Sequence, residues 1–318
     1  MKTKKKLTVG GVLTELSMPI LLVALIVFFS IMSDKFLTPL NLTNILVQNV
    51  HVAVCACAVM IIMISGGCDL SIGYQMSVAA VLVAKGMSVW GWNPVLAIIL
   101  AIALCSALGT FNGFMGIVLK SSTMIITLGT MAIFQGISYL ISGSKNFHNL
   151  PRSFMYIGQG KLFGWLPLNV VIMLVIVVIV GFVMGKTAVG RKVYAAGDNP
   201  EAARLAGLNV AKIKILSFTV AGVLVGISAV MLAARAGSAD SGTGVGSEFD
   251  GITACVLSGV ALKGGEGTLW KVVVAVFVLG VLANGMQLIN LGTYPQYIAK
   301  GAIMLGSLYL TNRNAKGV

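Results

Sequence analysis

The side chains that could perform chemistry in this 318-residue chain are few and scattered. Its nine acidic residues are Glu15, Asp34, Asp69, Asp198, Glu201, Asp240, Glu248, Asp250 and Glu266, and none falls near the centre of a long apolar run. The two histidines stand alone, and no carboxylates are paired at catalytic spacing. The sequence therefore predicts no catalytic residue and no metal site.

A nucleotide site is not predicted either. The nearest approach to a phosphate loop is GFVMGKT (181–187), which has one residue too few between its glycines and follows an apolar run instead of a soluble strand. We interpret its lysine as a side chain reaching the membrane surface from the end of a span. The five cysteines lie in or beside apolar runs without a C-x-x-C pair, which is typical of small packing residues.

The elements that position these side chains are membrane helices. The chain is 58% hydrophobic and 10% charged, with a mean hydropathy of +0.98, whereas soluble domains are about 25% charged. Apolar runs of about 20 residues, each long enough to cross a bilayer, recur along the chain. We predict an all-α polytopic membrane protein, a single transmembrane domain over 1–318 with about ten helices. The expected spans are 13–33, 50–65, 72–90, 94–117, 122–141, 166–185, 215–233, 251–263, 270–290 and 295–311, with 38–49 as a candidate interfacial helix.

Glycines interrupt several of these spans. The chain has 38 glycines among 318 residues, about 12%, against about 7% on average. Small residues allow membrane helices to approach closely, and pairs such as Gly66-Gly67 and Gly264-Gly265 predict broken or re-entrant segments. Broken helices survive at membrane depth only where protein or a water-filled cavity surrounds them. A scaffold that encloses a pathway is therefore favoured.

The basic residues predict the orientation. If the N-terminus is cytoplasmic, 15 of the 22 basic residues lie on the cytoplasmic side and 6 outside, with Lys300 inside a span. Positive charge is retained on the cytoplasmic side during insertion. Both termini and the loop 186–214 are then cytoplasmic, and the loop 142–165 faces the periplasm. The net charge of +13 thus reflects membrane topology, and we predict no nucleic-acid partner.

A few polar residues within or beside the spans could line the pathway. Asp69 and Ser71 could cap the helix that follows them or present hydrogen bonds to a solute. Glu248 and Asp250, before the predicted 251–263 helix, have the same two interpretations. Neutral amides and hydroxyls beside aromatic rings would suit an uncharged, polyhydroxylated solute, although hydrogen bonding between helices explains any one of them equally well. The candidates are Asp69, Ser71, Asn112, Thr127, Phe134, Gln135, Asn284 and Gln287.

Energy for transport has no evident source within the chain. A carrier coupled to protons or sodium usually keeps an ionisable residue in mid-membrane, and no acidic residue is predicted there. Energy would then enter from a partner, and the segment GRKVYAAGDNPEAARLAG (190–207) is the longest polar stretch available to bind one. Asp198 or Asn199 could cap a short helix beginning with Pro200 and Glu201 and ending at Gly207.

Several stretches of the chain resemble one family, the permease subunits of bacterial ABC importers for ribose, arabinose, xylose, galactose and autoinducer-2. These stretches are GGCDLSIG (66–73), GTFNGF (109–114), ITLGTMAIFQGISYLISG (126–143), GRKVYAAGDNPEAARLAGLNVAKIKI (190–215) and GSEFDGITACVLSGVALKGGEG (246–267). The resemblance implies ten helices per subunit and a dimer with a second permease subunit. It also implies a cytoplasmic ABC ATPase subunit that binds ATP and Mg²⁺, and a periplasmic sugar-binding protein.

The resemblance also gives the 186–214 loop a role, because in related permeases the corresponding loop forms a coupling helix that docks into the ATPase. The implied coupling residues are Asp198, Asn199, Glu201, Ala203, Arg204 and Gly207. An amphipathic surface helix without a partner is the alternative for this loop. The chain is thus expected to be a sugar permease of the bacterial inner membrane without a cofactor of its own. An ion-coupled carrier is the first alternative function, and a membrane enzyme or channel is the second.

Overall fold

A computed structural model describes residues 9–315 as a helical bundle. Its long helices are α1 (Val9–Met32), α2 (Pro39–Ile64), α3 (Ile72–Ser88), α4 (Pro94–Val118), α5 (Thr123–Ser142), α7 (Leu168–Lys186), α10 (Val210–Ala236), α12 (Leu269–Leu288) and α13 (Thr293–Ala315). The shorter ones are α6 (Arg152–Gln159), α8 (Ala188–Asp198), α9 (Pro200–Leu205) and α11 (Ser247–Leu257). The antiparallel pair β1 (Lys161–Leu162) and β2 (Leu166–Pro167) is a small hairpin. The predicted all-α architecture is therefore confirmed.

The helices begin and end at residues with local signals. The side chains of Thr38 and Asn93 each cap a helix whose first residue is proline. Gly143 and Gly237 end α5 and α10 in the left-handed conformation that glycine adopts without strain. Because these signals lie within a few residues of each boundary, the sequence predicts most long helices closely.

Two predicted spans differ from the structure. The stretch 38–49 is not a separate helix, because Thr38 and Pro39 begin a helix that continues without interruption to Ile64. The predicted span 251–263 is also wrong. Its helix, α11, has only 11 residues and is about 16 Å long at 1.5 Å per residue, too short to cross a hydrocarbon core of about 30 Å. Among the described residues, six helices are long and apolar enough to cross a membrane: α2, α4, α5, α7, α10 and α12.

α2 lies at the centre of the bundle. It packs against α7, α10, α11 and α12, and its residues 52–64 are all buried. α10 crosses α4 at close range through small residues, since a Cβ on Gly222 or Gly226 would lie within 2.9 Å of the α4 backbone. Close approach of backbones replaces the hydrophobic driving force that is missing between helices in lipid.

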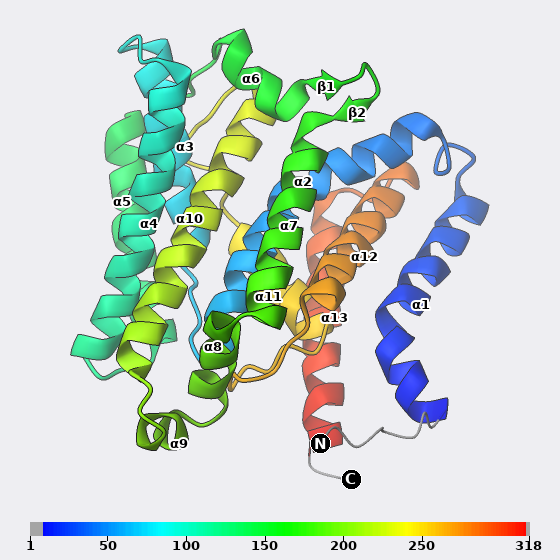
Figure 1. Cartoon of the computed structure of the whole chain (residues 1–318). Helices are drawn as coiled ribbons and strands as arrows, with labels where there is room; N and C mark the ends of the chain where they lie inside the picture. Colours follow the sequence, from blue (N-terminus) through cyan, green and yellow to red (C-terminus); the bar gives the residue numbers. More distant parts are fainter. Residues whose placement is uncertain (1–8, 316–318) are drawn as a thin grey trace.

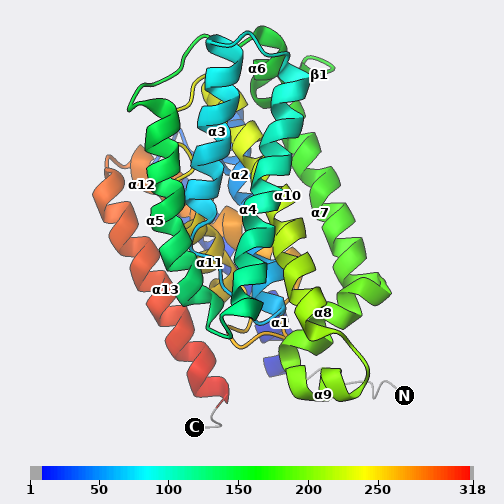
Figure 2. The ribbon, with the colours of Figure 1, turned by 90° about the vertical axis from the view of Figure 1, so that its left-hand side faces the viewer.

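The start of α1 and the end of α13 lie at the same end of the bundle as α8 and α9 (Figure 1). The segment with α6, β1 and β2 lies at the opposite end, and the view in Figure 2 shows the same arrangement. This arrangement agrees with the predicted grouping of the termini with the 186–214 loop. Which face of a membrane each end occupies stays a prediction.

Candidate functional site

The first candidate site is the break between α2 and α3, at residues 65–71. α2 ends in a Schellman motif, in which the N–H groups of Gly66 and Gly67 donate to the carbonyls of Met63 and Ile62 at 2.9 and 3.0 Å. Gly66 has a φ of +78°, which favours glycine. The predicted interruption at Gly66-Gly67 is confirmed.

Hydroxyl groups of α5 satisfy the backbone after this break. The N–H of Cys68 donates to Thr123 Oγ1 at 2.9 Å, and the N–H of Leu70 donates to Thr127 Oγ1 at 3.1 Å. Two residues of extended chain span about 6.6 Å and four residues of helix rise about 6 Å, so alternate N–H groups match hydroxyls one helical turn apart. The buried Thr127 thus holds the break against α5.

Asp69 is the centre of a buried hydrogen-bond network. Its Oδ1 accepts from the N–H and the hydroxyl of Ser71, at 2.8 and 2.6 Å. Its Oδ2 accepts from Gln75 Nε2 at 2.9 Å and from Asn112 Nδ2 at 3.2 Å. Both amides also donate to Ser71 Oγ, at 2.9 and 2.8 Å. The structure thus brings together three of the predicted pathway residues, all of them buried.

Gln75 completes this network and is absent from the sequence prediction. Its spacing is an available signal, because Gln75 stands four residues after Ser71 and so shares its helix face. The Ser71 side chain makes no capping hydrogen bond to α3; the carboxyl of Asp69 binds the Ser71 N–H instead. In this structure the network joins the break to α3 and α4.

The remaining predicted pathway residues lie apart from this network. Phe134 is buried on α5, and its neighbour Gln135 is half-buried. Asn284 exchanges two hydrogen bonds with Asn41, each 2.9 Å long, which join α12 to α2. Gln287 is exposed on α12. For Asn284, the structure therefore shows a hydrogen bond between helices, which is the alternative to a role in lining the pathway.

A polar cavity of about 500 Å³ lies between α11 and the first half of α13. Lys300 of α13 and Asp250 of α11 form an ion pair of 2.7 Å in its wall, with side chains 23% and 29% exposed. The other polar lining residues include His51, Thr253, Gln296 and Tyr297. Of these side chains, the sequence offers only Asp250 as a cap or a contact for a solute. A further signal is Lys300, a lysine within an apolar span.

A second cavity, of about 550 Å³, adjoins the break at residues 66–70. It extends to the turn between α4 and α5 and to residues 304 and 308 of α13. Phe249 and Met304 line both cavities. The two cavities therefore follow each other along α11 and α13, with these two side chains between them.

The segment 187–209 forms a further candidate site, apart from the break and the two cavities, at the end of the bundle that holds α8 and α9 (Figure 1). The Asn199 side chain accepts from the N–H of Ala202 at 3.0 Å, and Pro200 occupies the first position of α9. A Schellman motif ends α9, with Leu208 and Gly207 donating to Ala203 and Arg204. The predicted cap at Asn199 and the predicted end at Gly207 are confirmed, although α8 and α9 are two helices with only Asn199 between them.

The side chains of α9 divide into an exposed and a buried set. Glu201 and Arg204 form an ion pair of 3.3 Å with exposed side chains, and Leu205 is 84% exposed. Ala203 is buried against Ala196 of α8 and the start of α10. Ala203 therefore fixes the position of the helix, and the exposed set remains available to a partner.

α8 contacts the broken segments directly. A Cβ on Gly197 would overlap the carbonyl oxygen of Ile64 at the end of α2 and lie 2.8 Å from the nitrogen of Gly265. The same carbonyl accepts from the Gly265 N–H at 2.9 Å. Nearby, the Tyr194 hydroxyl donates to the carbonyl of Gly267 at 2.8 Å, and burial raises the pKa of Tyr194. We call this contact of α8 with residues 64–66 and 263–267 the glycine junction.

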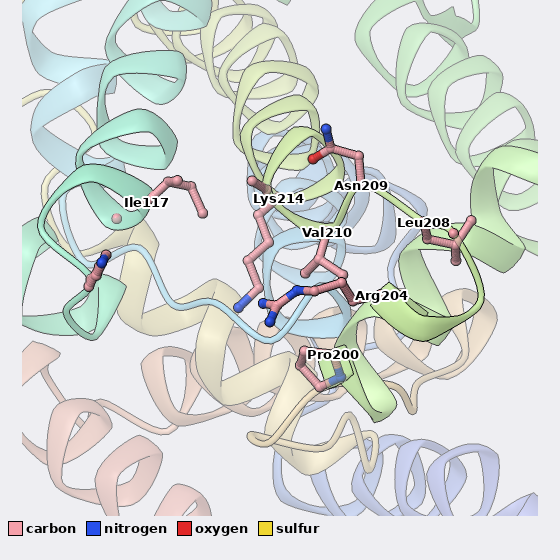
Figure 3. Close-up of a pocket in the computed structure, with 11 residues that line it drawn as sticks. Ile117, Pro200, Arg204, Leu208, Asn209, Val210 and Lys214 are labelled. Atoms are coloured by element: carbon pink, nitrogen blue, oxygen red, sulfur yellow. The ribbon is translucent and has the colours of Figure 1, made fainter. Parts of the chain in front are cut away.

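A basic pocket lies beside α9, between the end of α4 and the start of α10. Its volume is about 680 Å³, and it is lined by Lys120, Arg204 and Lys214 without an acidic residue. Figure 3 shows the side chains of Arg204 and Lys214 directed into this space. An acidic group of a partner would be complementary in charge.

Comparison with known proteins matches nearly the whole chain. A family model described as "Branched-chain amino acid transport system / permease component" matches residues 41–308. The ribose import permease protein RbsC of Bacillus subtilis (strain 168) is 32% identical, over 98% of this chain and 97% of its own length. The L-arabinose transport system permease protein AraH of Escherichia coli (strain K12) is 33% identical, over 96% and 92%. The chain belongs to this permease family.

A third relative of the permease is the xylose transport system permease protein XylH of Haemophilus influenzae, which is 28% identical over 95% of this chain. No solved structure matches the permease. The matched region 41–308 contains the break, both cavities and the glycine junction. The resemblance predicted from the motifs is thus confirmed, and the chain is a transport subunit.

Proposed function

We propose that this permease is the membrane subunit of an ATP-driven importer that moves a monosaccharide, such as the pentoses ribose, arabinose or xylose, across the bacterial inner membrane. The observation that carries this proposal is similarity over nearly the full chain to permeases named for these three sugars. A cytoplasmic ATPase subunit binds ATP and Mg²⁺, a periplasmic sugar-binding protein delivers the sugar, and a second permease subunit completes a homodimer.

The pathway in this proposal follows the two cavities along α11 and α13. Hydroxyl, amide and ion-paired groups around an aromatic ring provide donors and acceptors for a neutral sugar. Phe249 and Met304 form the constriction between the cavities. Asp69, Ser71, Asn112 and Thr127 support the wall of the pathway, because their polar groups bind one another and the backbone.

Uptake is expected to fall about tenfold when either partner of the pair Asp250–Lys300 is neutralised, as in Asp250→Asn or Lys300→Gln. Such a change corresponds to about 1.4 kcal/mol, a reasonable loss when one charge of a half-buried pair stays behind unpaired. Initial rates of labelled pentose uptake in proteoliposomes measure this effect. The exchange Asp250→Lys with Lys300→Asp should recover part of the rate. If the exchange variant is as inactive as the two single variants, a role for the ion pair is contradicted.

Coupling in this proposal runs through α9. The end of the bundle that holds α8 and α9 faces the cytoplasm. There the exposed side chains of Glu201, Arg204 and Leu205 dock on the ATPase subunit. Closure of the ATPase subunits on ATP moves this helix. The glycine junction passes the movement to the end of α2 and to the loop between α11 and α12. Gly66, Gly67 and Leu262 of these segments line the second cavity.

The double variant Glu201→Arg with Gly207→Pro is expected to abolish both ATPase stimulation and uptake. Proline requires a φ near −65°, whereas Gly207 has a φ of +83°, so the end of α9 cannot form. Lys161→Glu at the opposite end of the bundle is the matched charge reversal and should retain activity. The measurement uses proteoliposomes with the ATPase subunit and the binding protein, and full activity of the double variant would overturn the coupling assignment.

The same proteoliposomes distinguish the proposed function from an ion-coupled carrier. Uptake is expected to require ATP and to persist when an ionophore collapses ion gradients. Uptake that persists without ATP and stops with the ionophore would overturn the proposal.

A further inference from the structure

A groove lies between α7 and α10 on the outside of the bundle. Both helices pack against α2, which is visible between them in Figure 1, and Ile61 of α2 lines the groove. The groove encloses about 480 Å³. Its sides are aliphatic, with Val180 and Val183 from α7 and Leu216 and Val220 from α10. In a bilayer this space opens toward lipid, so an acyl chain can fill it.

Two lysines border the same groove at its α8 end. Lys192 lies on α8 and Lys212 in the first turn of α10, and both are exposed. Neither forms an ion pair with another described residue, and no acidic residue lines the groove. An occupant with an apolar tail and an anionic head would therefore satisfy both parts of the groove. A free anion would leave the aliphatic part empty, and a neutral lipid would leave the lysines without a counter-charge.

We propose that this groove holds one anionic phospholipid, with an acyl chain between α7 and α10 and its phosphate bound by Lys192 and Lys212. Lys192 follows the end of the membrane helix α7 and Lys212 lies at the start of the membrane helix α10, at the depth expected of a lipid head group. Basic pockets between helices on the cytoplasmic side are suited to such head groups. The lipid contacts α8 and α10 together, the two helices that flank α9, so it braces the segment that carries the glycine junction.

The first test measures lipid preference in the full-length permease. The protein is reconstituted in nanodiscs of equal parts phosphatidylglycerol and phosphatidylcholine, and the lipids retained after detergent extraction are counted by native mass spectrometry. Two lysines near the surface correspond to an enrichment of about 10-fold or more for phosphatidylglycerol. Lys192→Gln with Lys212→Gln should remove this enrichment. Lys120→Gln with Lys271→Gln removes the same charge from the same end of the bundle, outside the groove and the glycine junction, and should retain it.

The second test addresses the acyl chain while both lysines remain. Val220→Trp places a large ring in the groove, since Val220 lines it and is 48% exposed. Val178→Trp is the matched control, on a part of α7 that is 69% exposed and outside the groove. Val220→Trp is expected to lose the retained phosphatidylglycerol, and Val178→Trp to keep it.

Three outcomes would overturn the proposal. One is equal retention of the two lipids by the unmodified permease. Another is an equal effect of the two lysine pairs, which would indicate a general response to net charge. The third is complete displacement of the lipid by millimolar inorganic phosphate, which would show that the lysines bind a free anion and that the aliphatic groove contributes nothing.

Discussion

Gly197→Ala is expected to abolish uptake and ATPase stimulation while the protein still reaches the membrane. The added Cβ would overlap the carbonyl oxygen of Ile64 and crowd the nitrogen of Gly265. That carbonyl and that nitrogen are already hydrogen-bonded to each other at 2.9 Å, so neither can move alone without breaking the bond. α8 must therefore separate from the end of α2 and from the loop between α11 and α12. Overpacking of this kind typically costs about 1–3 kcal/mol, and a shift of about 1 Å can reduce a rate about 100-fold.

The measurement pairs transport with a check of folding. Initial uptake and ATPase stimulation are compared in proteoliposomes, and the amount and monodispersity of the protein are followed by fluorescence size-exclusion chromatography. Gly185→Ala in α7 is the matched control, because its Cβ would have no heavy atom within 4 Å. Normal coupled transport by Gly197→Ala would contradict the role of the glycine junction.

The sequence predicts the local parts of this mechanism well. The break after Ile64, the cap at Asn199 and the end of α9 at Gly207 all depend on residues within a few positions of each feature. Their backbone requirements are visible in the sequence because glycine, proline and asparagine have distinct conformational preferences. Boundaries based on apolarity alone were less reliable, as the short α11 and the continuous α2 show.

The partners of buried polar groups could not be predicted in the same way. Asn284 binds Asn41, which lies 243 positions away in the chain, and Lys300 binds Asp250 across 50 positions. Tertiary packing decides which residues form such pairs, and neither the residue type nor the spacing along the chain indicates the partner. A buried position in an apolar helix predicts that a polar side chain has a partner, without predicting which one.

Asp69→Leu is expected to lower the free energy of unfolding by about 3 kcal/mol, whereas Asp69→Asn should cost less, about 1–2 kcal/mol. Leucine keeps the branch at Cγ, but it is larger and accepts no hydrogen bond. The N–H of Ser71 and the amides of Gln75 and Asn112 would each lose an acceptor in a buried site. A buried donor left unpaired costs about 1–3 kcal/mol, and the remaining bonds of both amides to Ser71 Oγ limit the total.

Asparagine differs because it keeps one of the two acceptor positions. Its side-chain oxygen can keep the bonds to the N–H and the hydroxyl of Ser71, whereas its NH₂ group replaces the oxygen that Gln75 and Asn112 bind. Because both amides retain their bonds to Ser71 Oγ, fewer donors lose a partner than with leucine. Melting midpoints of the purified protein in a single detergent compare the variants, with Asp34→Asn at the exposed turn between α1 and α2 as the matched control. If Asp69→Asn proves as damaging as Asp69→Leu, the oxygen that accepts from Ser71 contributes nothing to stability, and this account of the network is wrong.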